Sequence, residues 1–373
     1  MTTSEEQTIW VPFDILEKFM RDVFMSIGVP NADAEVCAEV LIEADKRGID
    51  SHGIGRMKPI YYDRIKDGIQ FAKTNFEIVR ETPATAVIDG HHGMGHVISK
   101  RAMQMAIDKA KETGMGMVAV RNSTHYGIAG YYALMACEAG MIGVNGSNAR
   151  PSIAPTFGVE NMLGTNPLTF GMPSDEDFPF VLDCATSVTQ RGKIEWYDRA
   201  GKDLPPGWVI DEAGKTRTDT HQILKDLVTG KAALTPLGGL GEETGGYKGY
   251  GYATVVEILS AALQQGAFLK GLLGLENGKR VPYKLGHFFI AMNVEAFCDL
   301  ADFKKTTGDI LRALRESKKA PDAERIYTAG EKEHLAGLER KDKGAPVNPA
   351  LRKAIDTMRA ECKLSDYHFP WDA

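Results

Sequence analysis

The sequence predicts an α/β fold built on a mixed sheet, with a helical N-terminal part. Two observations support this prediction. Apolar residues recur at helical spacing through the first seventy residues or so. Farther along, short β-branched runs alternate with helical patterns, as expected for helices that pack against a sheet.

Three helices are expected at the N-terminus. The first presents four apolar residues on one face: Leu16, Phe19, Val23 and Ile27. The second opens near Asn31 and ends at Arg47-Gly48. The third is predicted to begin at Asp50 or Ser51, because either side chain can cap a first helical turn. It would run to Gly68.

The middle of the chain alternates between strands and helices. Strands are predicted at 85–89, 117–121, 141–146, 180–182 and 288–292, and helices at 99–113, 128–139 and 250–264. Residues 198–220 are polar and rich in Gly and Pro, which predicts a surface loop. We divide the chain into a helical part (1–80), an α/β part that binds cofactor and substrate (81–330), and a C-terminal helical part that packs back on the N-terminal helices (331–373).

The amino-acid composition limits the classes of function that this protein can have. The 373 residues are 43% hydrophobic and carry a formal charge of -6, so no basic field for nucleic acid is present. The five cysteines form no C-x-x-C pair, which favours buried free thiols in a reducing, cytoplasmic setting. No long apolar run predicts a membrane span, and the N-terminus lacks the pattern of a signal peptide.

The most informative local motif is Ser51-His52-Gly53, followed by Arg56. In a helix that begins at Ser51, His52 and Arg56 share a face. A guanidinium can bind the carboxylate of a 2-oxo acid, and an imidazole can exchange a proton with the neighbouring oxygen. Spacing alone favours a capping serine followed by two surface side chains, because polar pairs four residues apart are common on helices.

Five other segments, which form three groups, combine small, hydroxyl and charged residues near predicted strand or helix ends. They are Ser123–Gly127, Leu163–Pro167 with Leu182–Ser187, and Pro236–Gly241 with Gly245–Gly249. Each could approach a phosphate or a flat ring closely. Each is also compatible with an ordinary turn, a helix cap or a flexible loop.

Several familiar signatures fail. Gly93-Met94-Gly95 lacks the third glycine of a dinucleotide fingerprint, since that position is Ile98. His91, His92 and His96 have no partner at recognised metal-ligand spacing, so no metal site is predicted. Ser51 also lacks the glycine-flanked elbow of a serine hydrolase.

Taken together and in this order, the motifs resemble the malate/L-lactate dehydrogenase family of the sulfolactate-dehydrogenase-like fold. That family includes ureidoglycolate dehydrogenase, diketogulonate reductase and piperideine-carboxylate reductase. The matching segments are 47–56, 123–133, 163–170, 182–187, 191–193, 236–239, 247–251 and 286–297. The resemblance covers most of the chain and implies a fold unrelated to the Rossmann sheet, which suits the failed fingerprint.

The resemblance implies a homodimer that binds NAD or NADP, with a small anionic 2-oxo or 2-hydroxy acid as substrate. His52 would carry the proton, supported by Ser51, with His125 as the alternative proton carrier. The substrate would contact Arg56, Thr165 and Asn166. The implied cofactor contacts are His125, Tyr126, Gly127, Asn148, Asp183, Cys184, Ala185, Ser187, Lys231, Tyr247, Lys248, Gly330 and Glu331.

The expected reaction is hydride transfer between nicotinamide and C2 of a malate- or lactate-type acid, with malate as the first choice. A reductase of a cyclic imino acid or of a longer 2-oxo acid would use the same site. A hydrolase using Ser51 and His52, and a non-catalytic binding protein, are further alternatives. The sequence does not choose between NAD and NADP.

Overall fold

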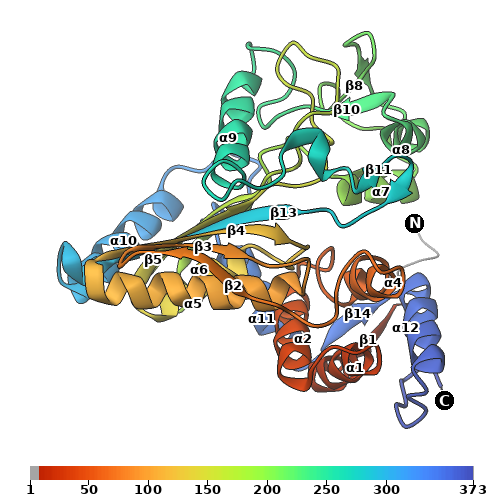
Figure 1. Ribbon diagram of the computed structural model, residues 1–373. Helices are drawn as coiled ribbons and strands as arrows, with labels where there is room; N and C mark the ends of the chain where they lie inside the picture. The colour runs from red at the N-terminus through yellow and green to blue at the C-terminus, as the bar shows by residue number, and fades with distance from the viewer. Residues whose placement is uncertain (1–7, 373) are drawn as a thin grey trace.

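A seven-stranded mixed sheet forms the centre of the computed structural model, which describes residues 8–372 (Figure 1). The strand order is β2-β3-β4-β13-β5-β6-β7. The strands are β2 (Glu77–Glu81), β3 (Thr85–Asp89), β4 (Met115–Ser123), β13 (Leu285–Asn293), β5 (Met141–Ser147), β6 (Leu168–Met172) and β7 (Phe180–Cys184). β3, β4, β5 and β7 run in one direction and the other three in the opposite one. The carboxyl ends of β4, β5 and β7 therefore meet at one edge.

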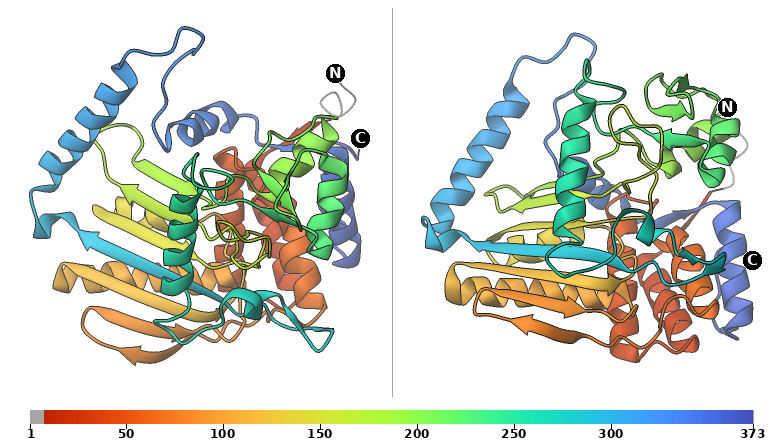
Figure 2. Two further views of the ribbon diagram at one scale, coloured as in Figure 1. Left: turned by 90° about the horizontal axis from the view of Figure 1, so that it is seen from above. Right: turned by 45° about the horizontal axis from the view of Figure 1, so that its top comes forward.

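Helices cover both faces of this sheet. α5 (Gly95–Thr113) and α6 (Gly130–Glu138) pack on one face, and α9 (Gly246–Leu259) lies over the other (Figures 1 and 2). The buried face of α5 is built from small residues, including Ala102, Ala106 and Ala110. Small side chains let the helix approach closely, and Gly116 of β4 has no room for a Cβ, which would lie 2.1 Å from the Ala106 carbonyl oxygen.

The two ends of the chain share one core. β1 (Ile9–Val11) pairs antiparallel with β14 (Ala345–Val347). α1 (Phe13–Ser26), α2 (Asn31–Lys46) and α12 (Pro349–Glu361) pack around this pair (Figure 1). Their common core includes Phe19, Phe24, Ile355 and Met358, all fully buried. The C-terminal segment thus lies against the N-terminal helices.

A smaller lobe lies above the sheet in Figure 1. It comprises α7 (Arg191–Arg199), β8 (Val209–Asp211), β9 (Thr216–Arg217), α8 (Thr220–Thr229) and β10 (Ala232–Leu234). The prediction of a surface loop at 198–220 was wrong for its second half. Val209 and Ile210 are buried here, and a strand this short gives little periodic signal against its polar surroundings.

The remaining elements connect these parts. They are α3 (Ile54–Arg56), the π-helix η1 (Met57–Tyr62), α4 (Asp63–Lys66), η2 (Leu269–Leu272), β11 (Leu275–Glu276), β12 (Lys279–Arg280), η3 (Val294–Ala296), α10 (Leu300–Glu316) and α11 (Glu331–Arg340). Within residues 8–372 no helix is long and apolar enough to cross a membrane. All five cysteines are free, but only Cys37 and Cys137 are buried, and Cys298 is exposed.

The predicted helix at 99–113 begins four residues earlier, at Gly95. The Gly95 N–H donates to Thr124 Oγ1 at 2.9 Å, and that hydroxyl donates to the Gly93 carbonyl oxygen. A Cβ at position 95 would lie 2.3 Å from the His125 carbonyl oxygen. The glycines that imitate a dinucleotide fingerprint therefore let α5 begin directly against the end of β4.

Candidate active site

The segment between α2 and α3 differs from the prediction. Residues 50–52 form a turn, and the helix begins at Ile54 rather than at Ser51. Its first N–H is capped from a distance, because Ile54 N–H donates to Asp45 Oδ2 at 2.8 Å. Ser51 instead hydrogen-bonds His52 Nδ1 at 2.8 Å. His52 and Arg56 are therefore not neighbours on one helical face, as the sequence had suggested.

Gly53 makes this turn possible. A Cβ at Gly53 would lie 1.9 Å from Asp45 Oδ1, and Asp45 is held in place by Ile54. Burial raises the pKa of Asp45 to about 8, so its carboxyl group sits in a dry and closely packed environment.

We expect Gly53→Ala to lower the free energy of unfolding by about 1–3 kcal/mol, as for other overpacked sites. It should also lower activity, because the displaced turn carries His52. Thermal unfolding and kcat would be measured beside Gly55→Ala, where the nearest atom to the added Cβ is 3.5 Å away. Equal stability and activity of the two variants would show that Asp45 does not constrain position 53.

Two histidines from distant parts of the chain meet in one cavity of about 240 Å³. His52 and His125 stack with their ring centroids 5.8 Å apart. His52 comes from the turn before α3, and His125 follows the carboxyl end of β4. The cavity is also lined by Ile49, Ser51, Tyr126, Gly127, Ile128, Ala129, Ser147, Asn148, Ala149, Thr165, Pro167, Asp183, Ala185, Gln190, Leu285 and Glu333.

The two imidazoles have different hydrogen-bonding constraints. The Gly127 N–H points to His125 Nδ1 at 3.3 Å, and Tyr61 Oη lies 2.5 Å from the same nitrogen. A backbone N–H can only donate, so His125 Nδ1 is an acceptor and the ring proton of neutral His125 is on Nε2. His52 Nδ1 meets a serine hydroxyl, which can donate or accept. His52 can therefore adopt either tautomer.

Both rings are neutral at neutral pH. Burial, and secondarily Arg56, lower the pKa of His52 to about 4. Burial also holds the pKa of His125 well below its usual range, with His52 and Arg64 adding to the effect. A neutral imidazole in this cavity can accept a proton, and a bound anion would raise its pKa toward neutrality.

Arg56 lies close to this cavity. Its Nε donates to the Ser51 carbonyl oxygen at 2.5 Å, which ties it to the turn that carries His52. Within residues 8–372 it has no carboxylate partner, so its guanidinium has hydrogen-bonding capacity left for an anion. Its terminal nitrogen lies near Gly192, at the start of α7, so the small lobe closes this side of the site.

A second cavity of about 350 Å³ adjoins the first. Four residues line both: Ile49, Ile128, Asp183 and Glu333. The Asp183 carboxylate accepts the Gly130 N–H at 2.7 Å and lies 3.3 Å from the Thr169 hydroxyl. Together the two cavities form one groove that runs from the carboxyl ends of β4 and β5 along β7 to the segment before α11, and this elongated shape suits an extended dinucleotide.

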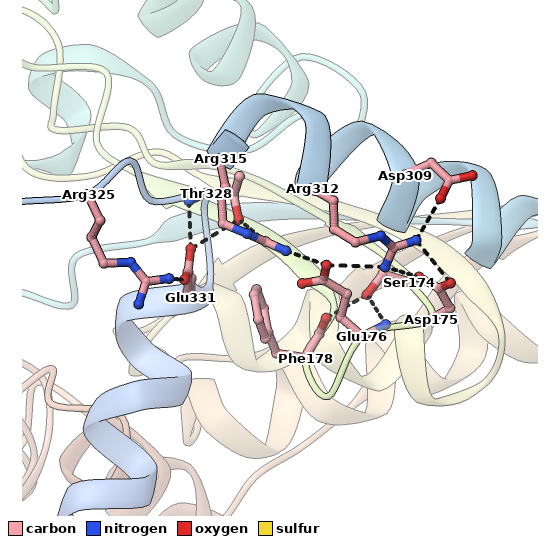
Figure 3. A network of polar contacts seen from close by, with 10 residues as sticks. All are labelled: Ser174, Asp175, Glu176, Phe178, Asp309, Arg312, Arg315, Arg325, Thr328 and Glu331. Carbon is pink, nitrogen blue, oxygen red and sulfur yellow. Dashed lines mark hydrogen bonds and ion pairs between the residues drawn. The ribbon is translucent and has the colours of Figure 1, made fainter. Parts of the chain in front are cut away.

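The groove also receives the segment that leads into α11. Gly330 has a φ of +90°, and a Cβ there would lie 2.9 Å from the Pro179 carbonyl oxygen. Glu331 is buried, pairs with Arg325 and accepts the Thr328 N–H at 3.0 Å (Figure 3). Gly330 lines the second cavity, whereas Glu331 fixes the polypeptide behind it.

The predicted site residues divide into two groups. His52, Ser51, His125, Tyr126, Gly127, Asn148, Thr165, Asp183, Ala185 and Gly330 line the groove. Arg56, Asn166, Cys184, Ser187, Lys231, Tyr247, Lys248 and Glu331 do not line it. Lys231 precedes β10 in the small lobe, and Tyr247 and Lys248 lie in the first turn of α9.

The side chains of Asn166 and Ser187 already form hydrogen bonds within the protein. The Asn166 amide donates to Ala253 O and Glu257 Oε2 and accepts the Ala149 N–H, so its hydrogen-bonding groups are occupied. Ser187 is buried and donates to the Thr189 carbonyl oxygen. A substrate role for Asn166 would require breaking these contacts.

Sequence reasoning missed three residues of this region. Tyr61 contacts His125 from 64 positions away, Asp45 caps the helix after His52, and Glu333 lines both cavities. Tyr61 lies in the π-helix, a distortion that often marks a functional site. No local pattern distinguishes these residues, since each acts through a contact distant in sequence. Within the described residues, no group of three or more His, Cys, Asp and Glu side chains is arranged so that it could hold a metal ion.

Known proteins resemble this chain over nearly its whole length. A malate dehydrogenase of Pyrococcus horikoshii is 42% identical over 359 residues, 96% of each chain. An L-sulfolactate dehydrogenase of Methanocaldococcus jannaschii is 39% identical over 328 residues, covering 87% of this chain and 90% of the relative. The crystal structure of malate dehydrogenase from Entamoeba histolytica superposes with a TM-score of 0.93 at 44% identity, covering 98% of this chain and 100% of that one.

A sequence profile of the malate/L-lactate dehydrogenase family matches residues 11–356. The non-Rossmann mixed sheet, the two histidines at its edge and the long groove beside them agree with that match. The chain therefore belongs to the malate/L-lactate dehydrogenase family and is a 2-hydroxy acid dehydrogenase that uses a nicotinamide cofactor.

Proposed function

We propose that this protein interconverts malate and oxaloacetate, with His52 as the proton carrier. The observation that supports His52 most directly is the pairing of its Nδ1 with the Ser51 hydroxyl. Because that hydroxyl can accept a hydrogen bond from His52 Nδ1–H, Nε2 can gain or lose a proton while Nδ1–H keeps its partner. Its pKa near 4 keeps it ready to accept the proton of a substrate hydroxyl.

His125 fits a different role. With Nδ1 receiving the Gly127 N–H, its Nε2 carries a hydrogen and can donate to a substrate oxygen. Accepting a proton at Nε2 would require the ring proton to move to Nδ1, against that backbone donor. We therefore assign His125 to orienting the substrate or the cofactor, and His52 to proton transfer.

The nicotinamide cofactor supplies or accepts the hydride at C2 of the acid. Residues of the groove, Asp183 and Gly330 among them, would hold it, and Arg56 would bind the substrate carboxylate. Displacement of water by the bound substrate would strengthen the attraction between this guanidinium and the carboxylate. We leave both NAD and NADP as candidates, and we propose a homodimer in the cytoplasm. Sedimentation would test the dimer.

The substrate proposal rests on the malate dehydrogenase relatives and is tested directly. Wild-type protein would be assayed with malate, lactate, sulfolactate and a cyclic imino acid, each with both cofactors, by nicotinamide absorbance. We expect the highest kcat/KM with malate. A higher kcat/KM for sulfolactate or for the imino acid would reassign the substrate. Turnover of none of them would overturn the proposal.

A further inference from the structure

Helix α11 lies behind the turn that carries His52. Arg340, in its last turn, donates to both carboxylate oxygens of Asp50, at 2.5 and 3.0 Å. The same guanidinium donates to the Asp45 carbonyl oxygen at 2.9 Å. One side chain from the C-terminal segment thus holds both ends of the turn that leads to Ser51 and His52.

Arg340 is well placed to hold a fixed position. Its side chain is only 14% exposed, and its guanidinium lies over the Trp10 ring, 5.7 Å from the centroid. A planar guanidinium held by an aromatic ring and a two-point carboxylate contact has little freedom to move. Asp50 is 49% exposed, so the less exposed Arg340 fixes the position of this ion pair.

Other residues on the same face of α11 lie beside this turn and beside the groove. Ala336 lies so near Gly48 that a Cβ there would be 3.0 Å from the Ala336 Cβ. Glu333, two helical turns before Arg340, lines both cavities of the groove. One face of α11 therefore runs from the cofactor groove to the back of the His52 turn.

The other end of α11 is also fixed. Arg315 of α10 donates to the Thr328 hydroxyl at 3.0 Å and pairs with Glu176, while the Thr328 N–H donates to Glu331 (Figure 3). Figure 3 shows this network joining α10, the turn between β6 and β7, and the first residue of α11. A helix held at both ends can transmit position from one end to the other.

We propose that Arg340 is a positioning residue for catalysis: through Asp50 it sets the place of His52 in the cavity. The proposal rests on the proposed function only in taking His52 as the proton carrier. Arg340 touches neither cavity, so its contribution is to geometry rather than to binding. A displacement of His52 by about 1 Å can lower a rate on the order of a hundredfold.

The test compares Arg340→Met and Asp50→Asn, singly and together. We expect each single variant to lower kcat by about tenfold or more, with much smaller changes in KM. The double variant should lose no more than the worse single variant, because both remove one contact. Arg340→Lys should recover part of kcat. Independent, additive losses would overturn the proposal.

Arg359 of α12 offers a matched control. It pairs with Asp372, donates to the Tyr367 carbonyl oxygen at 3.0 Å and lies over the Phe369 ring, yet it lines neither cavity. Arg359→Met should lower the Tm modestly, because it removes partly exposed contacts, while leaving kcat unchanged. Equal kcat for Arg340→Met and Arg359→Met would refute a positioning role. If Arg340→Met fails to fold, Asp50→Asn, with its half-exposed side chain, carries the comparison.

Imidazole NMR separates this proposal from the proposed function. The His52 signal, assigned by its loss in His52→Asn, should shift in Arg340→Met and in Asp50→Asn but not in Arg359→Met. This readout needs no substrate. Absence of turnover in the wild type would defeat the proposed function alone, whereas an unmoved His52 signal would defeat the positioning role alone.

Discussion

Replacing His52 with asparagine should lower kcat on the order of a hundredfold or more, while the protein stays folded and binds cofactor. Asparagine can keep a hydrogen bond to Ser51, as His52 Nδ1 does, but it cannot carry a proton. The loss therefore reports proton transfer rather than a collapsed turn. Steady-state kinetics of acid oxidation, together with cofactor binding by fluorescence, would measure it.

Two histidine variants complete this comparison. His125→Asn should also reduce activity, but by less, because we assign His125 to donating a hydrogen bond. His221→Asn is the inert control, since its side chain is 71% exposed and lines neither cavity. If His125→Asn lost the larger part of kcat and His52→Asn kept near-normal turnover, His125 would be the proton carrier.

Replacing Arg56 with leucine should raise the KM for the acid by about ten- to a hundredfold. A hydrogen bond to a charged group contributes about 1.5–3 kcal/mol, which corresponds to that range of affinity. Arg56→Lys should fall between wild type and Arg56→Leu, because an ammonium group keeps the charge but loses the two-point contact. An unchanged KM in Arg56→Leu would remove Arg56 from carboxylate binding.

The same variant has a distinct pH signature. In the free enzyme, kcat/KM for oxidation should rise through about pH 4 and then stay level, because His52 must be neutral to accept a proton. Arg56 lowers the pKa of His52, since two nearby positive charges repel. Arg56→Leu should therefore move the acid limb of the profile to higher pH. A limb that does not move would show that Arg56 does not act on the group that titrates.

Because the pKa of His52 is low, substrate binding is expected to change the protonation state of this side chain. Reduction of a 2-oxo acid needs protonated His52, which is scarce at neutral pH in the free protein. A bound carboxylate beside Arg56 would offset the repulsion and raise the pKa. Binding of the 2-oxo acid is therefore expected to be coupled to protonation of His52. His52 then becomes a proton donor only when a substrate is present to receive the proton.

Local sequence patterns were sufficient to predict much of the fold. The strand at 85–89 matches β3 in both ends, and the strand at 141–146 differs from β5 by one residue. Each strand contains a short apolar stretch, Ala86–Ile88 in β3 and Met141–Val144 in β5, so the signal lies within a few positions. The predicted helix at 99–113 begins later than the observed helix α5. The observed first residue depends on a hydrogen bond to Thr124 rather than on the helix's own sequence.

The sequence by itself determined the family and the chemical groups, because Ser51, His52, Arg56 and Asp183 occur in motifs of adjacent residues. Only the tertiary structure decided how those groups are held. The cap of α3 comes from Asp45, the partner of His125 is Tyr61, and the support of the His52 turn is Arg340. These contacts join segments up to 290 positions apart, and they arise because burial forces each polar group to find a partner wherever the fold brings one near.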